Sequence, residues 1–170
     1  MMLWVIKMLI PMTYHRDMAL QYAEKWALGR NPKYYNFDSL GGDCTNFVSQ
    51  CLYAGSRVMN YTPTLGWYYT SLQSRTPSWT GVKYLYNFLT TNDGVGPWAK
   101  EVSQDAVIPG DIIQLSNGEE FYHTLLVIKK EGRDIFIACH TFDAYMRPLS
   151  SYSYAHARFL HIEGVRGYGK

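Results

Sequence analysis

The sequence predicts an α+β fold in which helices come first and an antiparallel sheet follows. Apolar residues recur at helical spacing up to about residue 90. From residue 107 onward, short apolar runs alternate with turn signals such as Asn117-Gly118. Helices followed by strands are typical of the α+β class. The length of 170 residues and a hydrophobic content of 47% predict one domain spanning residues 1–170, with one sizeable core.

Residues 1–12 are apolar but too few to cross a membrane. They lack a basic n-region and a small-residue cleavage site, so we expect a packing arm or an edge strand rather than a signal peptide. A remnant of a longer leader, or a part of a larger parent protein, is the alternative. Residues 12–29 predict the first helix, because Met18, Tyr22 and Trp26 recur at helical spacing and Gly29 ends the pattern.

A second helix is expected to begin at Cys44, with Asp43 as its N-cap, and to end at Gly55. Its apolar residues follow helical spacing: Phe47, Val48, Cys51 and Leu52. Residues 56–80 show no periodicity and predict a long functional loop that shapes a groove. Residues 81–90 predict a third helix. The chain's 15 Tyr, 7 Phe and 5 Trp are expected to cover the rim of the core, with an aromatic-walled groove for a polymer as the alternative.

Four strands are predicted in the second half of the chain. Residues 107–115 predict a turn that feeds the first strand, and the other three lie at residues 121–128, 135–141 and 155–165. Glu131-Gly132 predicts a hairpin turn between the second and the third of them. Both faces of these two strands are apolar. We therefore expect them to lie in the middle of the sheet.

The first turn of the second helix is a favourable place for a reactive thiol. Cys44 follows Gly41, Gly42 and Asp43 directly. Unpaired amides and the helix dipole at this position favour a thiolate, which is the nucleophilic form of cysteine. The chain's two other cysteines, Cys51 and Cys139, lie within apolar patterns, so we expect them to be inert. Cys51 is two helical turns from Cys44, roughly 10 Å away, which is too far for a disulfide.

Two of the five histidines are expected to meet near this thiol. If Glu131-Gly132 form a two-residue hairpin loop, His123 and His140 stand opposite one another on neighbouring strands. A loop longer by one or two residues places Thr141 or Phe142 opposite His123 instead. A base that is oriented by a third polar group completes a nucleophilic triad. We therefore predict Cys44 as nucleophile, His123 as general base and His140 as the residue that orients it.

Charge and spacing exclude several function classes. A net charge of +2 without a basic run argues against nucleic-acid binding. No pair of cysteines or histidines has the spacing of a zinc site, so we expect no metal and no other cofactor. The sequence gives no prediction of the oligomeric state.

Four segments resemble a known family. Residues 41–50 resemble the nucleophile motif of the putative amidase domain family, a bacterial branch of the NlpC-type and CHAP-type papain-like superfamily. Residues 109–113 resemble the strand that precedes the catalytic histidine in that family. Residues 122–124 and 140–143 resemble its second and third catalytic segments.

The resemblance implies a papain-like fold, in which the nucleophile begins a helix that packs on a central antiparallel sheet. It implies hydrolysis of an amide bond through an acyl-enzyme, with a peptide or a peptidoglycan peptide as substrate. The third residue of the triad maps to His140, with Asp143 as the alternative. Many relatives are secreted or associated with the cell wall, but no clear signal peptide supports a compartment here. An acyltransferase on the same fold and an inactive peptide- or glycan-binding module are the alternative functions.

Overall fold

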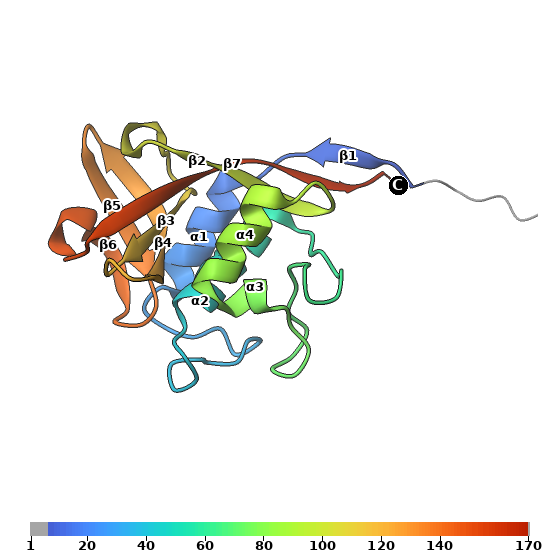
Figure 1. The fold of residues 1–170 in the computed structure, drawn as a ribbon, viewed down its shortest axis with the longest axis horizontal. Helices are drawn as coiled ribbons and strands as arrows, with labels where there is room; N and C mark the ends of the chain where they lie inside the picture. Colours follow the sequence, from blue (N-terminus) through green and yellow to red (C-terminus); the bar gives the residue numbers. More distant parts are fainter. Residues whose placement is uncertain (1–6, 170) are drawn as a thin grey trace, which may run out of the picture.

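The computed structural model describes residues 7–169, which contain four α-helices and a seven-stranded antiparallel sheet. Figure 1 shows the helices gathered against one side of the sheet. Residues 1–6 of the predicted N-terminal arm lie outside the described residues. The helices are α1 (Arg16–Trp26), α2 (Cys44–Ser56), α3 (Pro77–Thr80) and α4 (Val82–Thr91). The strands are β1 (Leu9–Met12), β2 (Gly96–Val102), β3 (Ile112–Ser116), β4 (Phe121–Glu131), β5 (Asp134–Cys139), β6 (Ala144–Pro148) and β7 (His156–Tyr168).

The long strand β7 organises the sheet, whose order is β1-β7-β3-β4-β5-β6. Its first residues pair with β3 and its last with β1. Strand β2 pairs with the opposite edge of β7 from β3, as Leu160 shows: it lies between Ile112 of β3 and Glu101 of β2. The β1 end of β7 extends away from the helices in Figure 1. The apolar segment Leu9–Met12 is therefore an exposed strand at one end of the sheet.

Apolar side chains pack on both faces of the central strands. On the helix-covered face, the sheet contributes Ile112, Leu126, Ala138 and Leu160 to a core that includes residues of α1, α2 and α4. Alternate residues on the same strands form a second core on the other face: Ile113, Leu125, Ile137 and Phe159. This alternation follows from the two-residue period of a strand. The predicted position of β4 and β5 in the middle of the sheet is confirmed.

Several predicted boundaries were wrong. The first helix begins at Arg16 rather than residue 12, because Met12 pairs with Val165 in the sheet. The last strand, β7, spans His156–Tyr168 rather than residues 155–165. The expected turn that feeds β3 is present, with Gly110 at φ +90° and the strand beginning at Ile112. The sequence patterns missed α3, β2 and β6 altogether. The elements α3 and β6 have four and five residues, too few for a clear period.

The predicted hairpin register was also wrong. Glu131 pairs with Asp134, so the turn residues are Gly132 and Arg133. A bulge between Val127 and Lys129 then shifts the pairing by one residue, and Leu126 lies opposite Ala138. Continued along the strands, this register places Thr141, not His140, opposite His123. One residue of shift moves a side chain to the other face of a sheet. His123 therefore shares the face of Leu125, whereas His140 lies on the helix-covered side.

Candidate active site

The predicted nucleophile begins helix α2, as its position in the sequence indicated. Cys44 is the first residue of the helix and follows a turn in which Gly41 and Gly42 adopt φ values of +86° and +100°. Other L-residues rarely adopt these values, so the two glycines are needed for this entry into the helix. The Cys44 side chain is nearly buried, with 7% exposure.

Cys44 and His123 line the same cavity, which has a volume of about 360 Å³. The other lining residues come from the turn before α2, the start of β4 and the segments around β6: Gly41, Gly42, Tyr122, Thr141, Phe142, Arg147 and Tyr152. No hydrogen bond joins the Cys44 sulfur to the imidazole of His123 within residues 7–169. Hydrogen bonds of catalytic groups are often long or poorly aligned before a ligand binds. The cavity therefore brings the two predicted groups together without a closed contact.

Burial dominates the protonation of both groups. It raises the pKa of the Cys44 thiol, while the backbone amide of Thr124 and the hydroxyl and amide of Thr45 act in the opposite direction. Burial lowers the pKa of His123 from 6.5 to about 4, with the positive charge of Arg147 as a second cause. In the ligand-free protein at neutral pH, both groups are consequently neutral. This differs from the thiolate that the helix start alone predicted.

His140 does not contact His123. Its Nδ1 lies 2.5 Å from Oδ2 of Asp43, and its Nε2 lies 2.8 Å from the carbonyl oxygen of Trp26. The ring also stacks on Phe47 of α2, with 4.1 Å between the ring centroids. Both nitrogens are thus engaged, so the ring has no free nitrogen with which to orient His123. Both ring nitrogens therefore face acceptor atoms, a carboxylate oxygen and a carbonyl oxygen.

Asp43 holds the turn before α2 together. Its side chain does not cap the helix. Instead, its Oδ1 accepts hydrogen bonds from the Phe37 amide at 2.8 Å and from Nδ2 of Asn46 at 2.9 Å. Nε of Arg30 lies 3.3 Å from Oδ2, close enough for an ion pair, but its direction does not make a hydrogen bond. The carboxylate of Asp43 is completely buried, so these contacts fix the residue that precedes Cys44.

Asp143, the alternative orienting residue, is also engaged elsewhere. Both of its carboxylate oxygens accept hydrogen bonds from Arg30, at 2.7 and 2.9 Å. Among the described residues, none donates to or accepts from the His123 ring. Neither His140 nor Asp143 therefore occupies the place of the third member of a triad.

A chain of hydrogen-bonded side chains leads to the sulfur. Arg158 donates twice to Oε1 of Gln114, at 2.8 and 2.6 Å, which fixes the orientation of that amide. Nε2 of Gln114 donates to Oγ1 of Thr124 at 3.2 Å. The hydroxyls of Thr124 and Thr45 lie 2.9 Å apart and share a hydrogen bond in which either can donate. Oγ1 of Thr45 lies 3.8 Å from the Cys44 sulfur, and a hydrogen bond from this hydroxyl lowers the pKa of the thiol.

The segments that resemble the family contain Thr45, Thr124 and every lining residue of the cavity except Arg147 and Tyr152. No pattern in the sequence indicated a role at the site for Gln114, Arg147 or Arg158. Arg147 lies on β6, a strand that was not predicted. The predicted groove-forming loop at residues 56–80 contributes no lining residue to the cavity. Its large aromatic side chains, Trp67 and Trp79, are instead fully buried in the core.

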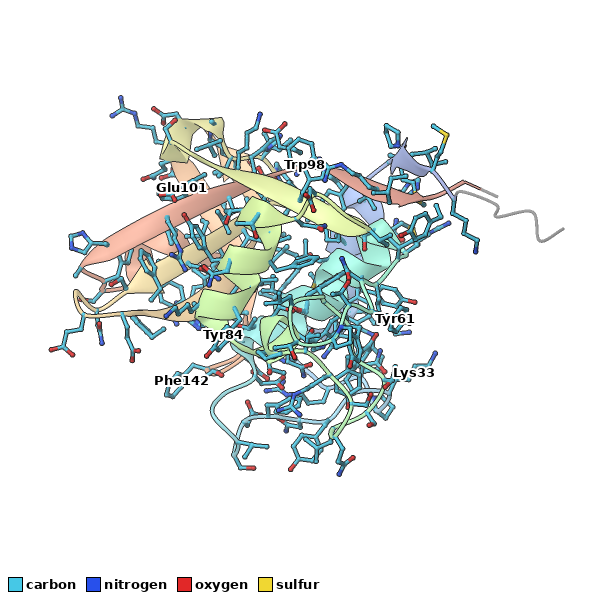
Figure 2. The ribbon with its side chains drawn as sticks, turned by 45° about the vertical axis from the view of Figure 1, so that its right-hand side comes forward. Lys33, Tyr61, Tyr84, Trp98, Glu101 and Phe142 are labelled. Carbon is cyan, nitrogen blue, oxygen red and sulfur yellow. The ribbon has the colours of Figure 1, made fainter. Side chains whose placement is uncertain are left out.

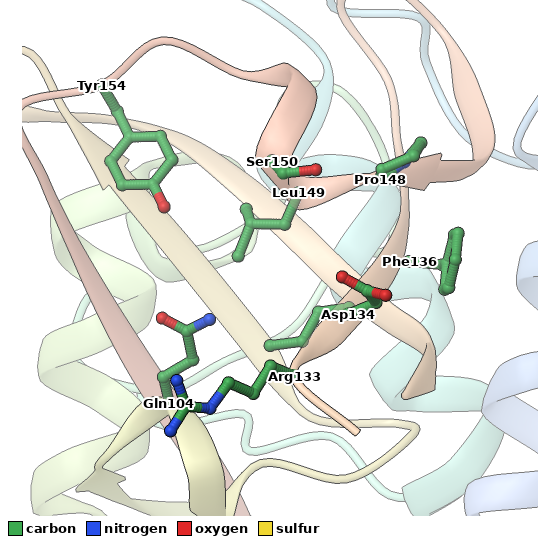
Figure 3. Close-up of a pocket in the computed structure, with 9 residues that line it drawn as sticks. Gln104, Arg133, Asp134, Phe136, Pro148, Leu149, Ser150 and Tyr154 are labelled. Carbon is green, nitrogen blue, oxygen red and sulfur yellow. The ribbon is translucent and has the colours of Figure 1, made fainter. Parts of the chain in front are cut away.

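The two remaining thiols and the hollow at the β4–β5 turn lack these features. Cys51 and Cys139 are fully buried, and burial raises the pKa of each thiol. The hollow lies beside Arg133 and Asp134 (Figure 3) and has a volume of about 330 Å³. No cysteine or histidine lines it. The candidate site is therefore the cavity at Cys44.

Residues 7–169 contain neither a cluster of metal ligands nor a membrane-spanning helix. No group of three or more histidine, cysteine, aspartate or glutamate side chains in this part of the chain is arranged to hold a metal ion. Nor is any helix there long and apolar enough to span a bilayer.

Comparisons with known proteins agree with the motif at Cys44. A family model described as a putative amidase domain matches residues 13–162. The chain is 37% identical over 139 residues to the uncharacterized protein YhbB of Bacillus subtilis (strain 168). The aligned part covers 79% of this chain but 43% of that relative, so the chain spans less than half of the relative's length. No solved structure matches the chain.

Proposed function

The chain belongs to the putative amidase domain family, and on that premise we propose that it is a papain-like cysteine hydrolase of amide bonds. Cys44 is the nucleophile of this proposal and His123 is the general base. One observation carries it: the thiol that begins α2 and the imidazole of His123 line the same cavity. The family match supports amide hydrolysis, and the cavity supports cysteine chemistry for it.

The proposed reaction has two steps that share one intermediate. His123 takes the proton of the Cys44 thiol as the sulfur attacks the carbonyl carbon of the amide. The C–N bond then breaks, and His123 returns the proton to the leaving amine. A water molecule attacks the resulting thioester and gives a proton to His123, which passes it to the departing sulfur. The products are a carboxylic acid and an amine.

A neutral thiol at Cys44 and a neutral imidazole at His123 fit a mechanism in which the base takes the proton while the sulfur attacks. Because burial lowers the pKa of His123, the imidazole is unprotonated and able to accept a proton at neutral pH. Three features oppose the effect of burial on the thiol. They are the free amides in the first turn of α2, the amide of Thr124 and the hydrogen bond from Thr45. The amides of the first turn also suit the oxyanion that forms during the attack.

His140 has a positioning role in this proposal. It links the carboxylate of Asp43 to the carbonyl of Trp26 at the end of α1. The residue before the nucleophile is thereby tied to the first helix. His140 acts through Asp43 and the entry to α2, not through the base.

The substrate we propose is a peptide, with the peptides of bacterial peptidoglycan as the main candidate. The test is incubation of the purified protein with peptidoglycan and with a peptide library, followed by mass spectrometry of the products. Cys44→Ala and His123→Ala are the matched inactive controls. New amine and acid ends that appear only with the intact protein support the proposal. Equal cleavage by Cys44→Ala would refute it. Transfer of the acyl group to an added amine, in preference to water, would identify an acyltransferase.

A further inference from the structure

A positive charge borders the cavity of the proposed reaction. Arg147 on β6 lines it together with Cys44 and His123. Its guanidinium lies over the ring of Tyr152, 3.9 Å from the ring centroid, and its Nε donates to Oγ of Ser151 at 2.8 Å. One side of the guanidinium is thus held by the protein in a fixed position next to the reacting groups.

This charge has no anionic partner among residues 7–169. No ion pair of the described residues includes Arg147, and its Nη1 donates no hydrogen bond to any of them. Asp143, on the loop before β6, is already bound by Arg30. No acidic side chain lines the cavity. The charge also acts on the proposed base, because it is the second cause of the lowered pKa of His123.

Aromatic surfaces stand beside the charge. Phe142 is 88% exposed and projects from the loop between β5 and β6 (Figure 2), and Tyr122 is 42% exposed. Exposed rings at the mouth of a cavity suit the apolar part of a ligand. A guanidinium is the side chain best suited to bind a carboxylate, because its donors match both oxygens.

We propose that Arg147 binds a carboxylate of the substrate, so that the enzyme acts on amides that carry a free carboxylate close to the scissile bond. This inference rests on the proposed function and names the substrate class of the same cavity. A substrate with a neutral amide in place of that carboxylate would leave the charge without a partner. The aromatic rings at the mouth contact the apolar part of both substrates alike, so only the carboxylate distinguishes them.

The test uses two alkylating reagents that differ by one group. Iodoacetate and iodoacetamide both lose iodide to a thiol, but only iodoacetate carries a carboxylate. We would measure the alkylation rate of Cys44 with each reagent by peptide mass spectrometry. The wild-type protein should favour iodoacetate, and the ratio of the iodoacetate rate to the iodoacetamide rate should fall at least about tenfold in Arg147→Met. This factor is the value of one charge-assisted hydrogen bond. Arg147→Lys keeps the positive charge and should retain part of the preference for iodoacetate. A change in the pKa of His123 alters both rates alike and cancels in the ratio.

Two further variants separate recognition from support of the fold. Ser151→Ala removes one of the contacts that hold the guanidinium, while the contact with the Tyr152 ring and the bond to the Ser151 carbonyl remain. The variant should therefore keep most of the preference for iodoacetate over iodoacetamide. Arg133→Met removes an arginine in the turn of the β4–β5 hairpin, at the end away from the cavity. This control should leave the ratio of the two rates unchanged. An unaltered ratio in Arg147→Met would overturn the inference. A Cys44 that reacts with neither reagent would instead count against the proposed function.

Discussion

Replacement of His140 by alanine should destabilise the protein much more than it impairs the chemistry. The change removes a hydrogen-bond partner from a fully buried carboxylate, and a hydrogen bond to a charged group is worth roughly 1.5 to 3 kcal/mol. Asp43 keeps three other contacts, with Arg30, Phe37 and Asn46. We therefore expect a loss of up to about 3 kcal/mol in the free energy of unfolding. The lost stacking on Phe47 acts in the same direction.

His123→Ala is the matched control. Its ring makes no hydrogen bond within residues 7–169 and borders a cavity, so the free energy of unfolding should change by about 1 kcal/mol or less. Its hydrolytic rate should fall by several orders of magnitude. His140→Ala should lose less than about tenfold in rate per folded molecule, because it acts only through Asp43.

The assay is urea unfolding at pH 7.5, above both the ordinary and the lowered pKa of His123, combined with hydrolysis per folded molecule. A domain of this size has a typical stability of 5 to 15 kcal/mol, so His140→Ala should remain mostly folded. A His140→Ala protein with unchanged stability and a rate as low as that of His123→Ala would refute the reasoning. In that case His140 orients the base, as the sequence predicted.

Four further results are expected. Thr45→Val should slow the alkylation of Cys44 by iodoacetamide at pH 7, whereas Thr45→Ser should retain the wild-type rate; equal rates would show that the hydrogen-bond chain has no effect on the sulfur. Because the pKa of His123 falls from 6.5 to about 4 on folding, the unfolded chain binds more protons in this range and stability decreases as the pH falls. Linkage gives a difference of about 2 kcal/mol at pH 5, which His123→Gln should abolish in urea unfolding measured across pH; an unchanged pH dependence would contradict the lowered pKa. Iodoacetamide should modify Cys44 well before Cys51 or Cys139, and hydrolysis should survive EDTA; loss of activity on chelation, restored by zinc, would overturn the cysteine mechanism.

The sequence by itself determined the parts of this protein that depend on local patterns. Helical periodicity and the Gly41-Gly42-Asp43 turn indicated that a helix begins at Cys44, and α2 begins there. Apolar strands with polar turns indicated an antiparallel sheet with β4 and β5 in its middle. These features can be read from spacing along the chain, because helical period, turn residues and the apolar faces of a strand are properties of neighbouring residues.

Only the tertiary structure decided which side chains meet at the site. A single bulge between Val127 and Lys129 separates His123 from His140, because one residue of shift reverses the face of a strand. No pattern in the sequence marks this bulge. The partners of His140, the path from Arg158 to Thr45 and the approach of Arg147 to the cavity join segments far apart in the chain. They depend on how α2 and β6 pack against the sheet, and burial in that packing also lowers the pKa of His123.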